Sequence, residues 1–172
     1  MSPRAVLVGL PGAGKSTAGR RLAKRLGVAF ADSDDLVQSR AGATVGEIFA
    51  SAGEAAFRGA EREAVAAALL RFDGVLALGG GAILADSTRA ALAETGVPVV
   101  LLSADLATLA ERLGPAEDRP LLAGDVSARL AELAAAREPL YREVATLVID
   151  TGALSTNEVA VAIERGLAAV PR

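Results

Sequence analysis

Five short, largely apolar runs divide the chain, the second of them ending in acids, and helical patterns fill the intervals between them. An apolar run without polar alternation is typical of a strand that is buried on both faces. Such strands, when they alternate with helices, predict a parallel sheet that is covered by helices on both sides. The expected strands are 4–10, 28–34, 75–81, 97–103 and 146–151, and the expected helices include 15–26, 44–51, 53–71, 86–94, 105–113, 126–137 and 156–168.

Length and charge narrow the class of protein. The 172 residues are the right size for one domain, and no apolar run approaches the ~20 residues that span a bilayer. The chain enters its first strand almost at once, which leaves no room for a signal peptide. A net charge of −3 without a basic stripe argues against nucleic acid or a membrane as a partner. We therefore expect a soluble, cytoplasmic protein.

The chain contains no cysteine and no histidine. This composition excludes disulfides, thiol catalysis, serine–histidine–aspartate triads and any metal site that needs His or Cys ligands. A bound metal must therefore sit on oxygen ligands, which favours Mg²⁺. A side-chain general base is most simply an aspartate or a glutamate.

The segment "GLPGAGKST" follows the first apolar run and precedes the first expected helix. Gly9, Gly14, Lys15 and Ser16 match the pattern G-x-x-x-x-G-K-[ST] of a phosphate-binding loop. In such a loop, backbone N–H groups surround the β-phosphate, the lysine reaches the β- and γ-phosphates, and the serine hydroxyl binds Mg²⁺. The lysine is notable because the chain has 16 arginines and only two lysines. The loop predicts that a nucleoside triphosphate is held, but it does not name an acceptor.

Two aspartates, Asp32 and Asp34, follow the second expected strand with one residue between them. Open parallel sheets bind their ligands at the carboxyl ends of the strands. One carboxylate could therefore hold Mg²⁺ through water while the other accepts a proton from a substrate hydroxyl. Aspartate also caps helices well, and we expect Asp35 to be the N-cap of a helix over 35–40.

Two further motifs have both a functional and a structural interpretation. Arg58 and Glu61 lie three apart on one helix face and can pair, but alone they would suggest a solvated salt bridge worth under ~1 kcal/mol. The glycine run 79–81 ends the third expected strand. Consecutive glycines there suggest close approach of a ligand or another backbone, and the alternative is a simple loop.

The stretch 113–125 interrupts the alternation with two prolines, two glycines and three acids. Its length and composition suggest a mobile lid, in which Arg119 could close over the triphosphate, although an ordinary surface connection would look similar. Arg137 is expected at a helix end before Pro139, where it could also serve as a partner of the helix dipole.

Taken in order along the chain, these motifs resemble those of the shikimate kinase family. The resemblance covers roughly residues 4–165 and rests on "GLPGAGKST", "DSD", the set Phe57, Arg58 and Glu61, "LGGGA", "RPLL" and "REPLY". It implies a P-loop fold like that of nucleoside-monophosphate kinases, a three-layer α/β/α domain with a five-stranded parallel sheet. It also implies one kinase domain over 1–172, with a substrate-binding helical segment at about 33–61 and a lid at about 113–125.

The implied reaction is transfer of the γ-phosphoryl group of ATP to the 3-hydroxyl of shikimate, a step toward chorismate and the aromatic amino acids. The implied catalytic residues are Lys15, Asp34 and Arg119, with Asp34 as the base. Ser16 and Asp32 would hold Mg²⁺, and Glu61 would orient Arg58. The implied ATP-binding residues are Gly12, Ala13, Gly14, Lys15, Ser16, Thr17, Arg112 and Arg119, and the implied substrate-binding residues are Asp34, Arg58, Gly79, Gly80, Gly81 and Arg137.

Other functions compete with this interpretation. A gluconate kinase or a nucleoside-monophosphate kinase would share the loop, but it would not need Asp34, Arg58, the glycine run and Arg137 together. A guanine-nucleotide switch would carry N/T-K-x-D, which is absent because Lys24 is followed by Arg25 and Leu26. A transport-type ATPase would carry a strand that ends in Asp-Glu, and none is present. We expect a monomer that acts on ATP and shikimate as small-molecule substrates.

Overall fold

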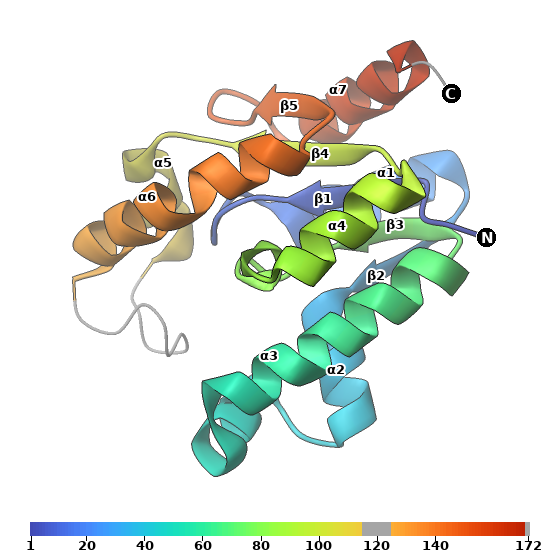
Figure 1. Cartoon of the computed structure of the whole chain (residues 1–172). Coiled ribbons are helices and arrows are strands. Elements are labelled where there is room, and N and C mark those ends of the chain that lie inside the picture. Colours follow the sequence, from blue (N-terminus) through green and yellow to red (C-terminus); the bar gives the residue numbers. More distant parts are fainter. Residues whose placement is uncertain (115–124, 171–172) are drawn as a thin grey trace.

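The computed structural model describes residues 1–114 and 125–170. Within this part of the chain, five strands form one parallel sheet with helices on both faces (Figure 1). The predicted α/β fold with a five-stranded parallel sheet is therefore confirmed. The strands are β1 (Ala5–Val8), β2 (Ala29–Asp32), β3 (Gly74–Ala77), β4 (Val99–Ser103) and β5 (Leu147–Asp150). The helices are α1 (Lys15–Leu26), α2 (Ser33–Ala41), α3 (Val45–Arg71), α4 (Asp86–Thr95), α5 (Leu106–Leu113), α6 (Val126–Val144) and α7 (Thr156–Ala169), with a 3₁₀ turn η1 (Ala82–Leu84).

The sheet has the strand order β2-β3-β1-β4-β5, which places β1 at its centre. All four residues of β1 are buried, as its continuous apolar sequence predicts. Leu7 pairs with Ala77 of β3 on one side and with Val100 of β4 on the other. The chain crosses over β1 between β3 and β4, so the order reverses next to β1. Open α/β sheets bind ligands at such a reversal.

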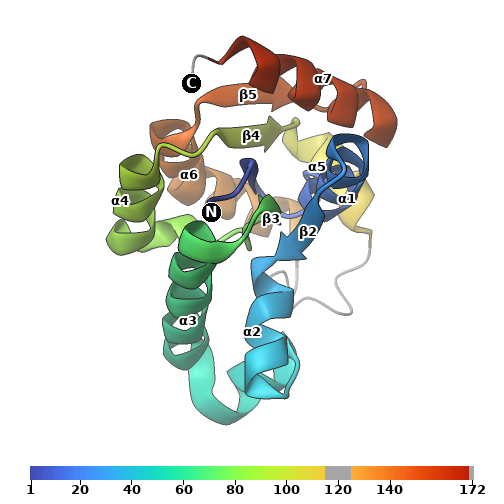
Figure 2. The same ribbon diagram turned by 90° about the vertical axis from the view of Figure 1, so that its right-hand side faces the viewer.

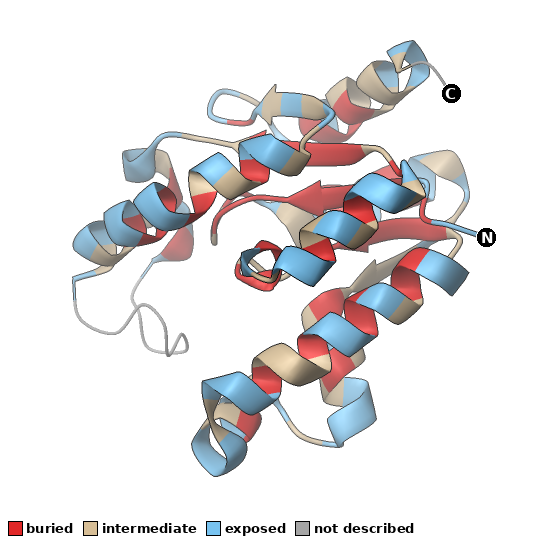
Figure 3. Cartoon of the chain, viewed as in Figure 1, coloured by how far each residue is buried: buried red, intermediate tan, exposed pale blue. Residues whose placement is uncertain are grey.

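Two helical layers cover the sheet. In Figure 2, α3 and α4 lie on one side of the strands and α1 lies on the other. On the first side α4 contacts both α3 and α6, and on the second side α1 contacts α7. Figure 3 shows that burial is concentrated in the three central strands, β3, β1 and β4, and on the helix faces that meet the sheet, whereas the edge strands β2 and β5 are partly exposed. Within the described residues, no helix is both long enough and apolar enough to cross a bilayer.

The helices α2 and α3 form a projection with a small core of its own. Figures 1 and 2 both show α2 and the first half of α3 extending away from the sheet. Val37, Ile48 and Phe57 are buried there in a cluster separate from the main core. The helix α3 is kinked at Gly53 (φ 83°), which is where the two helices predicted from the sequence were expected to meet. The substrate-binding segment expected at 33–61 lies in this projection.

The N-cap of α2 differs from the prediction. The helix begins at Ser33, and its N-cap is Asp32, whose Oδ1 accepts the backbone N–H of Asp34 at 3.0 Å. The prediction that Asp35 caps this helix was therefore wrong. Asp32 is the N-cap because it ends β2 in an extended conformation (φ −117°, ψ 134°), which is the backbone geometry that an N-cap requires.

The end of α6 also differs. The helix runs through Pro139 to Val144, so the predicted end at 137 was wrong and Arg137 does not lie at a helix terminus. A proline inside a helix costs about 3 kcal/mol, since it removes one backbone hydrogen bond and crowds the preceding turn. Continuing the helix buries Tyr141, which is only 1% exposed. Burial of a large aromatic side chain is worth an amount comparable to that cost.

Candidate active site

A cleft of about 1430 Å³ lies over the carboxyl ends of the central strands. Pockets for a single small ligand have about 300–1,000 Å³, so this cleft has room for more than one substrate. Its lining joins the loop after β1, the start of α2, the middle of α3, the turn after β3 and the middle of α6. The predicted residues among its lining are Gly12, Ala13, Gly14, Lys15, Ser16, Thr17, Asp32, Asp34, Arg58, Glu61, Gly79, Gly80, Gly81, Arg112 and Arg137.

The loop between β1 and α1 forms one end of the cleft. Gly14 is the N-cap of α1 and has a left-handed backbone (φ 87°, ψ 23°), which only glycine adopts without strain. The first turn of α1 contains no acidic residue, so the positive end of the helix dipole is open toward an anion. Lys15 Nζ donates to the carbonyl oxygens of Gly9 (2.8 Å) and Leu10 (3.1 Å), which holds its ammonium over the loop. This end of the cleft is suited to binding phosphate groups.

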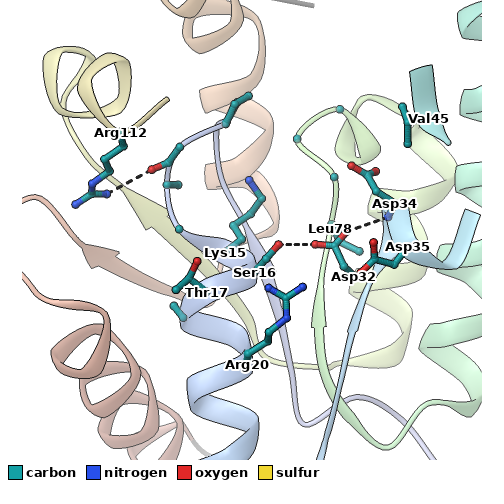
Figure 4. Close-up of a pocket in the computed structure, with 18 of the residues that line it drawn as sticks. Lys15, Ser16, Thr17, Arg20, Asp32, Asp34, Asp35, Val45, Leu78 and Arg112 are labelled. Carbon is teal, nitrogen blue, oxygen red and sulfur yellow. Dashed lines mark hydrogen bonds between the residues drawn. The ribbon is translucent and has the colours of Figure 1, made fainter. Parts of the chain in front are cut away.

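Ser16 and Asp32 meet beside this loop. Ser16 Oγ donates to Asp32 Oδ2 at 2.5 Å, while the other oxygen of Asp32 caps α2 (Figure 4). The pair brings together two oxygen ligands from α1 and β2. In the described part of the chain, no cluster of three or more acidic residues could hold a metal by itself. A cation at this position would need further oxygens from phosphate or water.

Asp34 lies deeper in the cleft, one residue after the start of α2. Its pKa is raised above the usual range, first by burial and then by the nearby carboxylate of Asp32, with a smaller contribution from Asp35. Lys15 and Arg58 act in the opposite direction and stabilise the carboxylate. A carboxyl group whose pKa is moved toward neutrality by burial is a better general base than an exposed one.

Arg58 and Glu61 form an ion pair in which the carboxylate is buried and the guanidinium is partly buried, which contradicts the interpretation of this motif as a solvated salt bridge. Arg58 Nη1 donates to Glu61 Oε2 at 2.7 Å, and the side chain of Glu61 is only 2% exposed. Burial raises the pKa of Glu61, although Arg58 opposes the shift. Arg58 Nε and Glu61 Oε1 are buried without a hydrogen-bond partner in the described structure. Unpaired buried atoms of this kind are costly, and a water, ion or ligand that bonds to them would complete the site.

The three glycines after β3 are in contact with these charged side chains. The strand ends at Ala77, and Gly79–Gly81 form the turn that leads into η1. A Cβ at Gly79 would lie 2.6 Å from Asp34 Oδ1 and 2.7 Å from Glu61 Oε1. A Cβ at Gly81 would collide with the guanidinium of Arg58. The glycines therefore allow the backbone to lie directly against the charged groups, which the simple-loop alternative does not require.

Arg137 approaches the same turn from α6. Its side chain is buried, and its Nη1 lies 3.0 Å from the position of a Cβ at Gly80. Tyr141, one helical turn later, donates from its hydroxyl to the Gly80 carbonyl at 2.5 Å. Two arginines, Arg58 and Arg137, thus reach the turn from different helices. Guanidinium groups bind carboxylates through paired hydrogen bonds, so this region is suited to an anionic small molecule.

Arg112 closes the other side of the phosphate loop. Its guanidinium donates to Thr151 Oγ1 at 2.9 Å, to the Thr151 carbonyl at 2.8 Å and to the Gly12 carbonyl at 3.5 Å. The contact with Gly12 is drawn in Figure 4. The residue joins the end of α5 to the loops after β1 and β5. It forms a wall of the cleft beyond the phosphate loop.

Comparison with known proteins decides the family. Residues 11–168 match the family model described as shikimate kinase. The chain belongs to the shikimate kinase family. A shikimate kinase of Saccharopolyspora erythraea is 57% identical over 152 residues, which cover 88% of this chain and 86% of that protein. A shikimate kinase of Thermobifida fusca is 50% identical over 167 residues, with coverage of 97% and 96%. The resemblance found in the motifs is therefore confirmed.

Solved structures support the family assignment. Shikimate kinase from Acinetobacter baumannii in complex with shikimate has a TM-score of 0.91 at 36% identity and covers 98% of this chain and 93% of its own. A gluconokinase from Sinorhizobium meliloti 1021 has a TM-score of 0.66 at 23% identity and covers 95% and 90%. The second likeness shows only that the P-loop kinase fold is shared. The chain is thus a kinase of this fold.

One predicted site residue lies outside the described structure, and others were missed. Arg119 and most of the lid expected at 113–125 fall within 115–124, outside the described residues. Sequence reasoning assigned no role to Ser33, Tyr141 or Thr151, which hold parts of this shikimate kinase site by hydrogen bonds. Ser33 lies inside the "DSD" motif and Tyr141 ends "REPLY", so the motifs themselves contained the signal.

Proposed function

We propose that this chain transfers the γ-phosphoryl group of ATP to the 3-hydroxyl of shikimate, giving shikimate 3-phosphate and ADP for chorismate and aromatic amino acid biosynthesis. The observation that carries the proposal is the pairing of two different sites in one cleft. A phosphate-binding loop stands at one end, and Asp34 lies with Arg58 and Arg137 at the other. This combination is suited to a triphosphate donor and a small acceptor that has both a carboxylate and hydroxyls.

The donor half consists of the loop and Arg112. The backbone N–H groups of Gly12 to Thr17 would surround the phosphates, and Lys15 would neutralise charge on the β- and γ-phosphates. Arg112 lies where the nucleotide base would extend beyond the loop, beside Thr151. Arg119 remains a prediction from the sequence and would act on the same phosphates.

The magnesium ion of this proposal would be held by Ser16 Oγ and, through water, by Asp32. The fit rests on the donor set, which contains only hard oxygen ligands that meet at 2.5 Å beside the phosphate loop. Bound Mg²⁺ would neutralise charge that develops on the phosphates during transfer. The ion would be shared with ATP, because no group of three or more acidic side chains within the described residues could hold it alone.

The acceptor half performs two tasks in this proposal. Arg58 and Arg137 would hold the shikimate carboxylate, with Glu61 fixing the direction of Arg58. Asp34 would accept the proton of the attacking hydroxyl, for which its raised pKa is suited. Gly79–Gly81 would let the substrate ring lie against the backbone. Phosphoryl transfer depends mainly on positioning and charge neutralisation, which these groups supply without histidine.

The proposal also concerns the arrangement of the chain. We take residues 1–172 as one kinase domain, in which the segment 33–61 supplies the acceptor side and the segment 113–125 acts as a lid. The enzyme is expected to work as a monomer in the cytoplasm on ATP and shikimate alone.

An assay of ADP release tests the proposal directly. The protein is incubated with ATP and Mg²⁺ and, in parallel, with shikimate, gluconate or AMP as the acceptor. We expect ADP to be released with shikimate as the acceptor and not with gluconate or AMP. Release with gluconate or AMP, but not with shikimate, would overturn the proposal. The variant Lys15→Met is the control for contaminating kinases, because it is expected to keep the fold while it lacks the ammonium over the loop.

A further inference from the structure

The turn Gly79–Gly81 is the point at which the charged groups of the acceptor half converge, yet it has no side chains to hold its shape. Glycine loses more conformational freedom on folding than any other residue, and the entropy costs of three consecutive glycines add up. Asp34, Glu61, Arg58 and Arg137 all pack on this turn. Their geometry is therefore only as well defined as the turn itself, so something outside the turn must hold it.

One restraint comes from Ser33, at the start of α2. Its hydroxyl oxygen accepts the backbone N–H of Gly79 at 2.7 Å, across 46 positions of sequence. Ser33 is fully buried, so water does not compete for this bond. It also lies between Asp32 and Asp34, and the bond therefore ties the first turn of α2 to the glycine turn.

A second restraint comes from Tyr141 in α6. Its hydroxyl donates to the Gly80 carbonyl at 2.5 Å, and the side chain is only 1% exposed. Burial raises the pKa of Tyr141 to about 12, so the hydroxyl keeps the proton that it donates at neutral pH. A trans peptide directs its carbonyl and the following N–H to opposite sides. Fixing the Gly80 carbonyl therefore also fixes the direction of the Gly81 N–H.

We propose that Ser33 and Tyr141 are positioning residues for the acceptor, and that they act through the turn Gly79–Gly81 rather than by touching the substrate. The inference rests on the proposed function for its kinetic consequence. Together the two hydroxyls hold one N–H and one carbonyl of adjacent residues, from two different helices. Loss of either bond lets the glycine peptides rotate, and the arginines and carboxylates packed on them lose their alignment.

The kinetic test compares Ser33→Ala and Tyr141→Phe with Thr146→Val. The control also removes a hydroxyl that bonds the backbone, since Thr146 Oγ1 donates to the Val99 carbonyl at 3.1 Å and accepts the Val99 N–H at 3.0 Å, but at the opposite end of the sheet from the cleft. Each of the first two variants should raise the KM for shikimate about three- to ten-fold, the loss expected of one hydrogen bond, and change the KM for ATP by less than about two-fold. The control should leave both constants unchanged. An unchanged KM for shikimate in both variants would overturn the proposal.

A second measurement needs no substrate. Hydrogen–deuterium exchange of a peptide that spans 76–84, in which the Gly79 N–H is an internal amide, should be faster in Ser33→Ala and in Tyr141→Phe than in the parent, and unchanged in Thr146→Val. If the parent protein does not phosphorylate shikimate but the two variants still exchange faster, the proposed function is wrong and the two hydrogen-bond restraints on the turn are still supported. Unchanged exchange in both variants would refute the restraints, whatever the kinase activity.

Discussion

Replacement of Gly79 by alanine tests whether the close packing of the turn controls catalysis. The backbone at Gly79 lies outside the left-handed region, so alanine fits its dihedral angles and only the added methyl matters. That methyl would lie 2.6 Å from Asp34 Oδ1 and 2.7 Å from Glu61 Oε1, whereas ordinary contact begins at 3.4 Å. Each carboxylate must therefore move by about 0.7–0.8 Å, or the turn must move away from them.

The size of the effect follows from this displacement. A misplacement of about 1 Å in a catalytic site costs about 100-fold in rate. We expect kcat/KM for shikimate to fall about 30-fold, which is about 2 kcal/mol of transition-state stabilisation. Overpacking of a buried site should also lower the free energy of unfolding by about 1–3 kcal/mol. The KM for ATP should change little, because the methyl points at the acceptor carboxylates.

The assay is coupled ADP release at varied shikimate and saturating ATP, with thermal unfolding measured on the same samples. Gly59→Ala is the matched control, since Gly59 lies next to Arg58 in α3 and its added methyl would meet nothing closer than 3.9 Å. That variant should keep full activity and gain some stability, because alanine favours the helix. Full kcat/KM for shikimate in Gly79→Ala would refute the argument from packing.

Three further predictions concern the charged groups. Arg58→Ala should raise the KM for shikimate about 10- to 100-fold, since a lost charge-assisted hydrogen bond costs about 1.5–3 kcal/mol, while Arg62→Ala, at an exposed position of the same helix, should not. Lys15→Met should abolish turnover with an unchanged circular dichroism spectrum, and near-normal kcat would contradict the role given to the loop. Because the pKa of Asp34 is raised and the base must be ionised, kcat/KM for shikimate should fall as the pH falls through that raised pKa; a pH profile that is flat there would exclude Asp34 as the base.

Much of the fold could be predicted because its signals are local. Short apolar runs predicted the five strands, and the helix over 15–26 was predicted with the bounds of α1. The two errors, at the end of α6 and at the N-cap of α2, arise because packing and backbone geometry outweigh the local sequence signals there. Proline at 139 indicates a helix end, but burial of Tyr141 by the rest of the molecule continues the helix. Asp32 and Asp35 are both good caps by type, and only the extended backbone at the end of β2 selects the first.

The candidate site was harder to predict from the sequence, because the sequence does not show which of its charged side chains are buried. Arg58 and Glu61 read as a surface pair from their spacing, yet Glu61 is 2% exposed and keeps an unpartnered oxygen. The glycine run predicted that another group comes close to the turn Gly79–Gly81. It could not predict which side chains these are. Ser33 was missed because its bond to Gly79 joins segments far apart in the chain.

The placement of Tyr141 has an optical consequence. It is the only tyrosine of the chain, and the sequence has no tryptophan. The near-ultraviolet absorbance and the fluorescence that the protein shows beyond those of phenylalanine therefore come from one ring, whose hydroxyl is bonded to Gly80. The unmodified protein thus carries its own chromophore directly behind Gly80, which lines the cleft. We therefore expect binding in the acceptor half to change the tyrosine emission, which can be measured without a label and without turnover.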